Sequence, residues 1–86
     1  MTVNETNQTL ALAALGWILE DNARAERLVA LTGLTPDALR SGLGDRQVLS
    51  AILAFLEAHE PDLLACAEAL NVPPAELVEA RRRLDA

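Results

Sequence analysis

His59 is the only histidine of the 86-residue chain, so any histidine-dependent chemistry must use it. A serine or cysteine nucleophile would need this imidazole as its general base, and the candidates are Ser41, Ser50 and Cys66. None of them lies in the Gly-x-Ser-x-Gly context that exposes a nucleophile at a sharp turn. His59 falls near a predicted helix end, where a cation is electrostatically favourable. We therefore expect no catalytic residue and do not expect an enzyme.

His59 belongs to the densest group of potential metal ligands in the sequence. The group consists of Glu57, His59, Glu60, Asp62 and Cys66. A zinc-binding helix of the His-Glu-x-x-His type needs a second histidine where this chain has Leu63. Pro61 also interrupts the helical spacing that the ligands would require. The glycines do not form a phosphate-binding loop either. We therefore expect a solvated acidic corner, with no metal and no cofactor.

Residues 63–84 are similar to the DNA-binding helix-turn-helix pattern. They place a small Ala67 in the first helix, a turn at Asn71, and apolar side chains at Val72 and Leu77. In that fold, the helix after the turn enters the major groove. Two helices that simply pack across a tight turn would show the same features.

The charges on the second of these helices separate the two interpretations. Arg82 and Arg83 are suited to DNA phosphates, but Glu76 and Glu79 occupy the half of the helix that contacts bases in such proteins. We therefore keep DNA binding as the alternative hypothesis and expect no nucleic-acid partner. Residues 81–83 either form a site or only complete the helix, and the sequence leaves both open.

Two similar turn segments each separate one predicted helix from the next, and these helices must position the candidate residues named above. Gly33 and Asn71 can adopt positive φ and end a helix. Pro36 and Pro74 suit the first position of the next helix, and Thr35 can cap it. The chain therefore contains two predicted helix–turn–helix units.

The composition favours helices throughout. The chain is 51% hydrophobic with only 2% aromatic residues, because most of its apolar residues are leucine and alanine. We expect helices over about residues 6–21, 22–33, 36–41, 45–59, 61–70 and 74–86. The fold class is all-α: a compact orthogonal bundle of five to six short helices in a single domain, residues 1–86, with residues 1–5 frayed. The fourth helix should be central because large apolar residues cover more than half of its circumference: Val48, Leu49, Ile52, Leu53, Phe55 and Leu56.

The first predicted helix is apolar on two opposite faces. Leu10, Ala14, Trp17 and Ile18 form one of them, and Trp17 and Phe55 are expected in the core. A second apolar face is buried either in the core or by a second copy of the protein. Its residues are the candidate interface: Leu12, Leu15 and Leu19.

The formal net charge of −6 opposes generic binding to nucleic acids and anionic membranes. A single cysteine excludes an intramolecular disulfide and fits a reducing compartment, and we expect Cys66 to be a buried apolar residue. The N-terminal residues lack the basic region of a secretory signal. We expect a soluble cytoplasmic protein that acts without catalysis as an interaction or adaptor module, with another protein or a second copy as its partner.

Four segments of the chain resemble a known family. They are residues 30–40 (ALTGLTPDALR), 44–45 (GD), 52–56 (ILAFL) and 73–77 (PPAEL). The family consists of short, acidic, all-helical bacterial proteins and is catalogued as a domain of unknown function. The resemblance implies a small helical protein of bacteria and carries no activity or functional residue.

Overall fold

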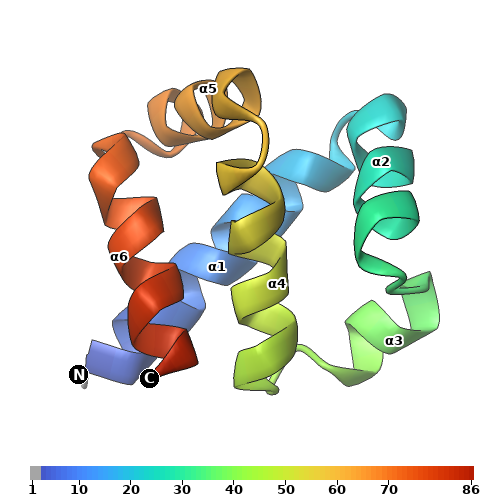
Figure 1. Ribbon diagram of the computed structural model, residues 1–86, viewed down its shortest axis with the longest axis horizontal. Helices are drawn as coiled ribbons and strands as arrows, with labels where there is room; N and C mark the ends of the chain where they lie inside the picture. The colour runs from blue at the N-terminus through green and yellow to red at the C-terminus, as the bar shows by residue number, and fades with distance from the viewer. Residues whose placement is uncertain (1–2) are drawn as a thin grey trace.

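The computed structural model describes residues 3–86, which form six α-helices and no strand (Figure 1). The helices are α1 (Val3–Leu19), α2 (Asn22–Thr32), α3 (Pro36–Ser41), α4 (Arg46–Glu57), α5 (Glu60–Leu70) and α6 (Pro74–Asp85). The predicted all-α bundle is confirmed. None of these helices combines the length and the apolar run that crossing a bilayer requires.

The predicted helix boundaries differ from the observed ones by a few residues. α1 begins at Val3, so residues 3–5 of the segment expected to fray are helical, and residues 1–2 lie outside the described residues. α5 begins at Glu60, which places Pro61 at its second position. Proline is tolerated throughout the first turn because its missing N–H would have no intrahelical partner there.

Side-chain caps start α2 and α3, and the cap of α3 is the predicted Thr35. One carboxylate oxygen of Asp21 accepts the backbone N–H groups of Ala23 at 2.8 Å and Arg24 at 3.1 Å. The hydroxyl of Thr35 accepts the N–H of Ala38 at 3.1 Å. These bonds satisfy N–H groups that the first helical turn leaves without partners.

Left-handed residues end α2 and α5. Gly33 has φ 74°, and its N–H donates to the carbonyl of Val29 at 2.9 Å. Asn71 has φ 59°, and the following Val72 N–H donates to the carbonyl of Ala67 at 3.0 Å. Both helices therefore stop at a residue that tolerates this backbone conformation.

The core lies between α1, α4 and α6, which pack on one another, and α4 is central as predicted (Figure 1). α4 buries six side chains: Leu49, Ser50, Ile52, Leu53, Phe55 and Leu56. α6 adds Leu77, Ala80 and Leu84. Trp17 is half-buried at the margin of this core, so its predicted full membership is only partly met.

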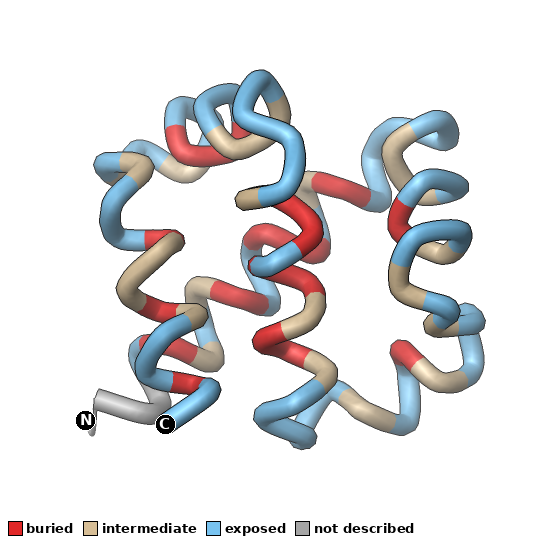
Figure 2. Tube along the Cα trace, viewed as in Figure 1, coloured by how far each residue is buried: buried red, intermediate tan, exposed pale blue. Residues whose placement is uncertain are grey.

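The remaining helices cover the core unevenly. α5 packs on all three core helices, and α2 packs on α1 and α4. α3 contributes a single buried side chain, Leu39 (Figure 2). The described residues form a slab of 31 × 27 × 18 Å, whose short dimension corresponds to two layers of helices. α3 lies at the edge of this slab (Figure 1).

Candidate functional site

An apolar groove of about 260 Å³ lies between the C-terminal end of α1, α2 and α3. We call it the α1–α2–α3 groove; its lining consists of Leu15, Leu19, Ala25, Val29, Pro36, Leu39, Arg40 and Leu43. Arg40 is the only charged side chain in this lining. Next to the groove, Ala25, Val29 and Pro36 continue into a shallower hollow that also involves Glu26 and Ala30.

Side-chain size explains why the groove is not filled. α2 directs Leu28 into the core, where it is fully buried, and turns the smaller Ala25 and Val29 toward the groove. Buried leucines at Leu15 and Leu39 lie at its base. Close packing of an interior requires side chains that fill the space between helices, and these small residues leave it open.

The rim of the groove carries two exposed leucines. Leu19 at the end of α1 is 50% exposed, and Leu43 after α3 is 37% exposed. A concave apolar surface with exposed apolar rims binds apolar side chains, since their burial removes hydrocarbon surface from water. Apart from Arg40, every side chain that lines the groove is apolar.

The three leucines of the candidate interface do not form one exposed face. Leu12 is 40% exposed and Leu19 is 50% exposed, but Leu15 is only 6% exposed and belongs to the core. Of the two alternatives for this face, Leu15 follows burial in the core, although it also lines the α1–α2–α3 groove. α2 packs on α1, and the helical pattern of α1 alone does not reveal which of its leucines this neighbour covers.

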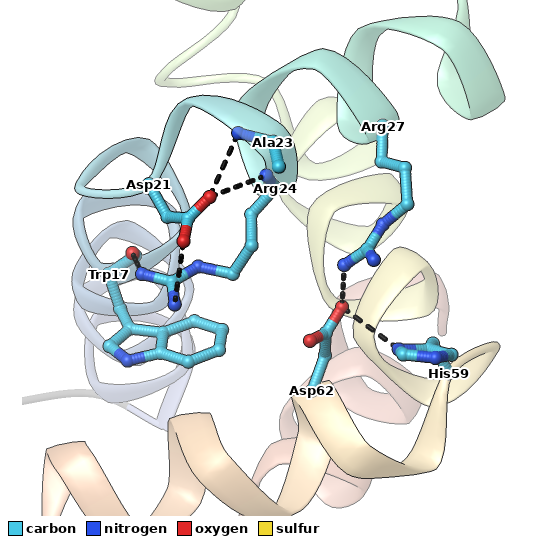
Figure 3. A network of polar contacts seen from close by, with 7 residues as sticks. All are labelled: Trp17, Asp21, Ala23, Arg24, Arg27, His59 and Asp62. Atoms are coloured by element: carbon cyan, nitrogen blue, oxygen red, sulfur yellow. Dashed lines mark hydrogen bonds and ion pairs between the residues drawn. The ribbon is translucent and has the colours of Figure 1, made fainter.

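A compact contact fixes the turn between α1 and α2 (Figure 3). The guanidinium of Arg24 lies 3.7 Å from the centroid of the Trp17 ring, and its Nη2 donates to the Trp17 carbonyl at 2.5 Å. Asp21 caps α2, and the hydrogen bond from the Arg24 N–H, followed by that from Ala23, lowers the pKa of its carboxyl. These contacts join the C-terminal end of α1 to the first turn of α2.

His59 lies outside the groove, between α4 and α5 (Figure 3). Its Nδ1 is 3.0 Å from a carboxylate oxygen of Asp62, which also accepts the guanidinium of Arg27 from α2. The imidazole is half-exposed at the surface. The link between α5 and α2 is the pair of Asp62 and Arg27, and His59 contacts the same carboxylate.

The hydrogen bonds of the two serines go to groups other than His59. Among the described residues, Ser41 donates to the Asp37 carbonyl at 2.9 Å and Ser50 donates to the carboxylate of Asp85. Cys66 is buried as predicted, and this burial raises the pKa of its thiol to about 11. The thiol therefore stays protonated near neutral pH and is a poor nucleophile.

The acidic corner is occupied by ion pairs. Glu57 accepts the guanidinium of Arg81, and Asp62 accepts that of Arg27. Within the part of the chain that the structure describes, no three histidine, cysteine or acidic side chains gather as metal ligands. Of the five residues considered as ligands, His59 and Asp62 contact each other, and Glu57 is paired with Arg81.

Arg81 is a link between α4 and α6. It donates to Glu57 of α4 and to Asp85 at 2.7 Å, and the hydrogen bond to Glu57 raises the pKa of its guanidinium. The hydroxyl of Ser50, followed by Arg81, lowers the pKa of the Asp85 carboxyl. These contacts fasten the last turn of α6 to the central helix.

Arg82 and Arg83, the candidates for DNA contact, both face Glu79. Their nitrogens lie 2.8 Å and 3.9 Å from its carboxylate oxygens. The nearby Glu76 is exposed in the first turn of α6. The helix therefore presents its arginines together with acidic side chains, which weakens its potential for phosphate binding.

The groove is the feature that the sequence pattern missed. Its residues come from three helices and a loop, and only Leu15 and Leu19 among them belong to the predicted interface. The available signal was the pair Ala25 and Val29, small residues one turn apart beside Leu28. The spacing of Ala25 and Val29 indicates a groove only once the position of α3 opposite these residues is known.

Comparison with known families gives one match, which covers residues 4–86 and carries the description Protein of unknown function (DUF3572). Searches among curated proteins and solved structures find no match to this chain.

Proposed function

The chain belongs to this family of proteins of unknown function, and from its surface we propose that it is a non-catalytic protein–protein interaction module. The observation that carries the proposal is the α1–α2–α3 groove, an open apolar surface with two buried leucines at its base and two exposed leucines at its rim. An adaptor role follows, because such a surface recognises a partner without changing it chemically.

The proposed mechanism is burial of apolar side chains of a partner against Leu15 and Leu39. Each square ångström of apolar surface removed from water contributes about 25 cal/mol, so a few inserted side chains supply most of the favourable free energy. The partner is another protein or a second copy of this chain. A helix is a suitable ligand, since its apolar side chains project at regular intervals along one face.

The test is retention of a protein from an extract of the native cells on immobilised full-length chain. Leu19→Asp places a charge on the groove rim, and Leu31→Asp and Leu64→Asp are matched controls on other surfaces. All three leucines are exposed, by 50%, 70% and 47%, so the variants should fold. We expect one protein to be retained by the wild type and both controls and lost with Leu19→Asp.

Two results would overturn the proposal. One is retention that is unchanged by Leu19→Asp and lost with Leu31→Asp or Leu64→Asp, which would place binding elsewhere. The other is absence of any specifically retained protein from a chain that light scattering also shows to be monomeric. Circular dichroism of each variant confirms that lost retention does not reflect unfolding.

A further inference from the structure

Resting on the proposed function, we propose that the partner of the α1–α2–α3 groove is a basic amphipathic helix, with leucine-like side chains on one face and lysine or arginine beside them. The apolar part of this inference follows from the lining of the groove. The charge of the partner follows from the side chains that surround it.

Two acidic residues accompany the groove, one next to its rim in the sequence and one in the adjoining hollow. Glu20 directly follows the rim residue Leu19, and Glu26 borders the adjoining hollow. Both are exposed, and neither forms an ion pair with a described residue. Unpaired carboxylates next to an apolar groove attract cationic side chains and repel acidic ones.

The only guanidinium in the groove lining offsets little of this charge. Arg40 lies 3.3 Å from Asp37, and both side chains are largely exposed. The two arginines of α2 contact other groups: Arg24 lies over the Trp17 ring, and Arg27 binds Asp62. The surroundings of the groove therefore keep an acidic excess in Glu20 and Glu26.

The same charges disfavour two other occupants. A second copy of this chain carries a net charge of −6 and would bring like charge to an acidic rim. An anionic membrane would be repelled in the same way. A helix with cationic flanks satisfies both the apolar base and the acidic rim.

The test uses a displayed library of helical peptides with leucine at positions i, i+4 and i+7 and random residues at the flanking positions. The full-length chain serves as bait, and Leu19→Asp serves for counter-selection. This variant makes the rim more acidic, so peptides held by charge alone bind it as well and are removed. Leu43→Asp on the opposite rim replaces it for counter-selection if Leu19→Asp does not fold.

Anisotropy of a selected, labelled peptide then measures the contribution of single carboxylates. Glu26→Gln removes a charge beside the groove, and Glu68→Gln removes an equally exposed, unpaired charge from α5. We expect Glu26→Gln to weaken binding about two- to fivefold and Glu68→Gln to leave it unchanged. Raising the salt concentration from about 0.05 to 0.5 M should reduce the difference between the two variants.

The inference holds if the surviving peptides are enriched in lysine and arginine beside the leucines and respond to Glu26→Gln. Survivors without this enrichment would overturn it and leave the proposed function standing, because they still require Leu19. If no selected peptide depends on the groove, the inference is overturned. The proposed function is tested separately, by whether the immobilised chain retains a protein from the cell extract. A dimer that Leu19→Asp dissociates would also overturn the inference, because a second copy would then be the occupant.

Discussion

At the scale of single residues, Asp21 combines a structural and an electrostatic role. Its carboxylate caps α2 through the N–H groups of Arg24 and Ala23, which lowers its pKa below the ordinary value of 3.8. A carboxyl whose pKa is lower in the folded chain stabilises the fold above its unfolded pKa. This contribution is lost as the pH falls through the folded pKa.

We therefore expect the wild type to lose more stability than Asp21→Asn when the pH is lowered from 6 to about 2. Asparagine keeps a capping oxygen and does not titrate. Urea unfolding followed by circular dichroism at several pH values measures the difference. Parallel pH profiles for the two proteins would contradict the assigned role.

Gly42 is a residue that the structure requires for a steric reason. A Cβ at this position would lie 2.7 Å from the Val48 Cγ2 and 3.0 Å from the Ala38 carbonyl oxygen. We expect Gly42→Ala to lower the free energy of unfolding by about 1–3 kcal/mol because the backbone carbonyl cannot move freely. Gly44→Ala is the control, since no atom outside its chain neighbours lies within 4 Å. Equal thermal midpoints for the two variants would refute this account.

At the scale of elements, α1 shows how one helix face divides between core and surface. Leu15 is buried while Leu12, three residues earlier, is 40% exposed. We expect Leu15→Asp to abolish cooperative folding, because an unpaired charge would enter the core. Leu12→Asp should shift the free energy of unfolding by no more than about 0.5 kcal/mol. Thermal unfolding distinguishes the two, and a folded Leu15→Asp would return this residue to the candidate interface.

The three arginines of α6 divide in the same way. Arg81 bridges to Glu57 on α4 with both side chains about three-quarters buried, whereas Arg82 meets Glu79 at the surface. We expect Arg81→Ala to destabilise the fold by about 1–2 kcal/mol and Arg82→Ala by less than about 0.5 kcal/mol. Urea unfolding gives both values.

The same helix supplies a check on the DNA-binding alternative. A duplex probe at low salt should not shift with the wild-type chain, because Glu76 and Glu79 accompany the arginines. A shift that disappears in the Arg82→Ala, Arg83→Ala double variant would establish the alternative instead.

At the scale of the whole molecule, net charge and the burial of Leu15 bear on self-association. Leu15, the central residue of the predicted dimer face, is buried in the core, and each copy carries a net charge of −6. We expect size exclusion with light scattering to give the mass of a monomer at low salt over a wide concentration range. A dimer that persists on dilution would show that Leu12 and Leu19 pair between copies.

The ends of the helices could be predicted from the sequence because caps and turns depend on a few neighbouring residues. Thr35, Gly33 and Asn71 were all placed correctly at helix ends. The central position of α4 was equally predictable, since its apolar residues cover most of its circumference. Each of these conclusions uses contacts within about one helical turn.

The two predicted helix–turn–helix units illustrate where this local reasoning stops. Their turn chemistry is alike, yet α3 buries one side chain and α6 buries three in the core. The reason is that α6 packs between α1 and α4, while α3 lies at the edge of the slab. The amount of apolar surface that a helix buries depends on its neighbours in space.

The sequence by itself therefore determined the helices, their ends and the identity of the central one, because these depend on nearby residues and on one periodic pattern. Only the tertiary structure decided that Leu15 is buried, that Arg81 joins two helices, and that three helix ends leave an apolar groove. Each of these depends on residues distant in sequence meeting at particular angles. Side-chain periodicity along one helix contains no information about those angles.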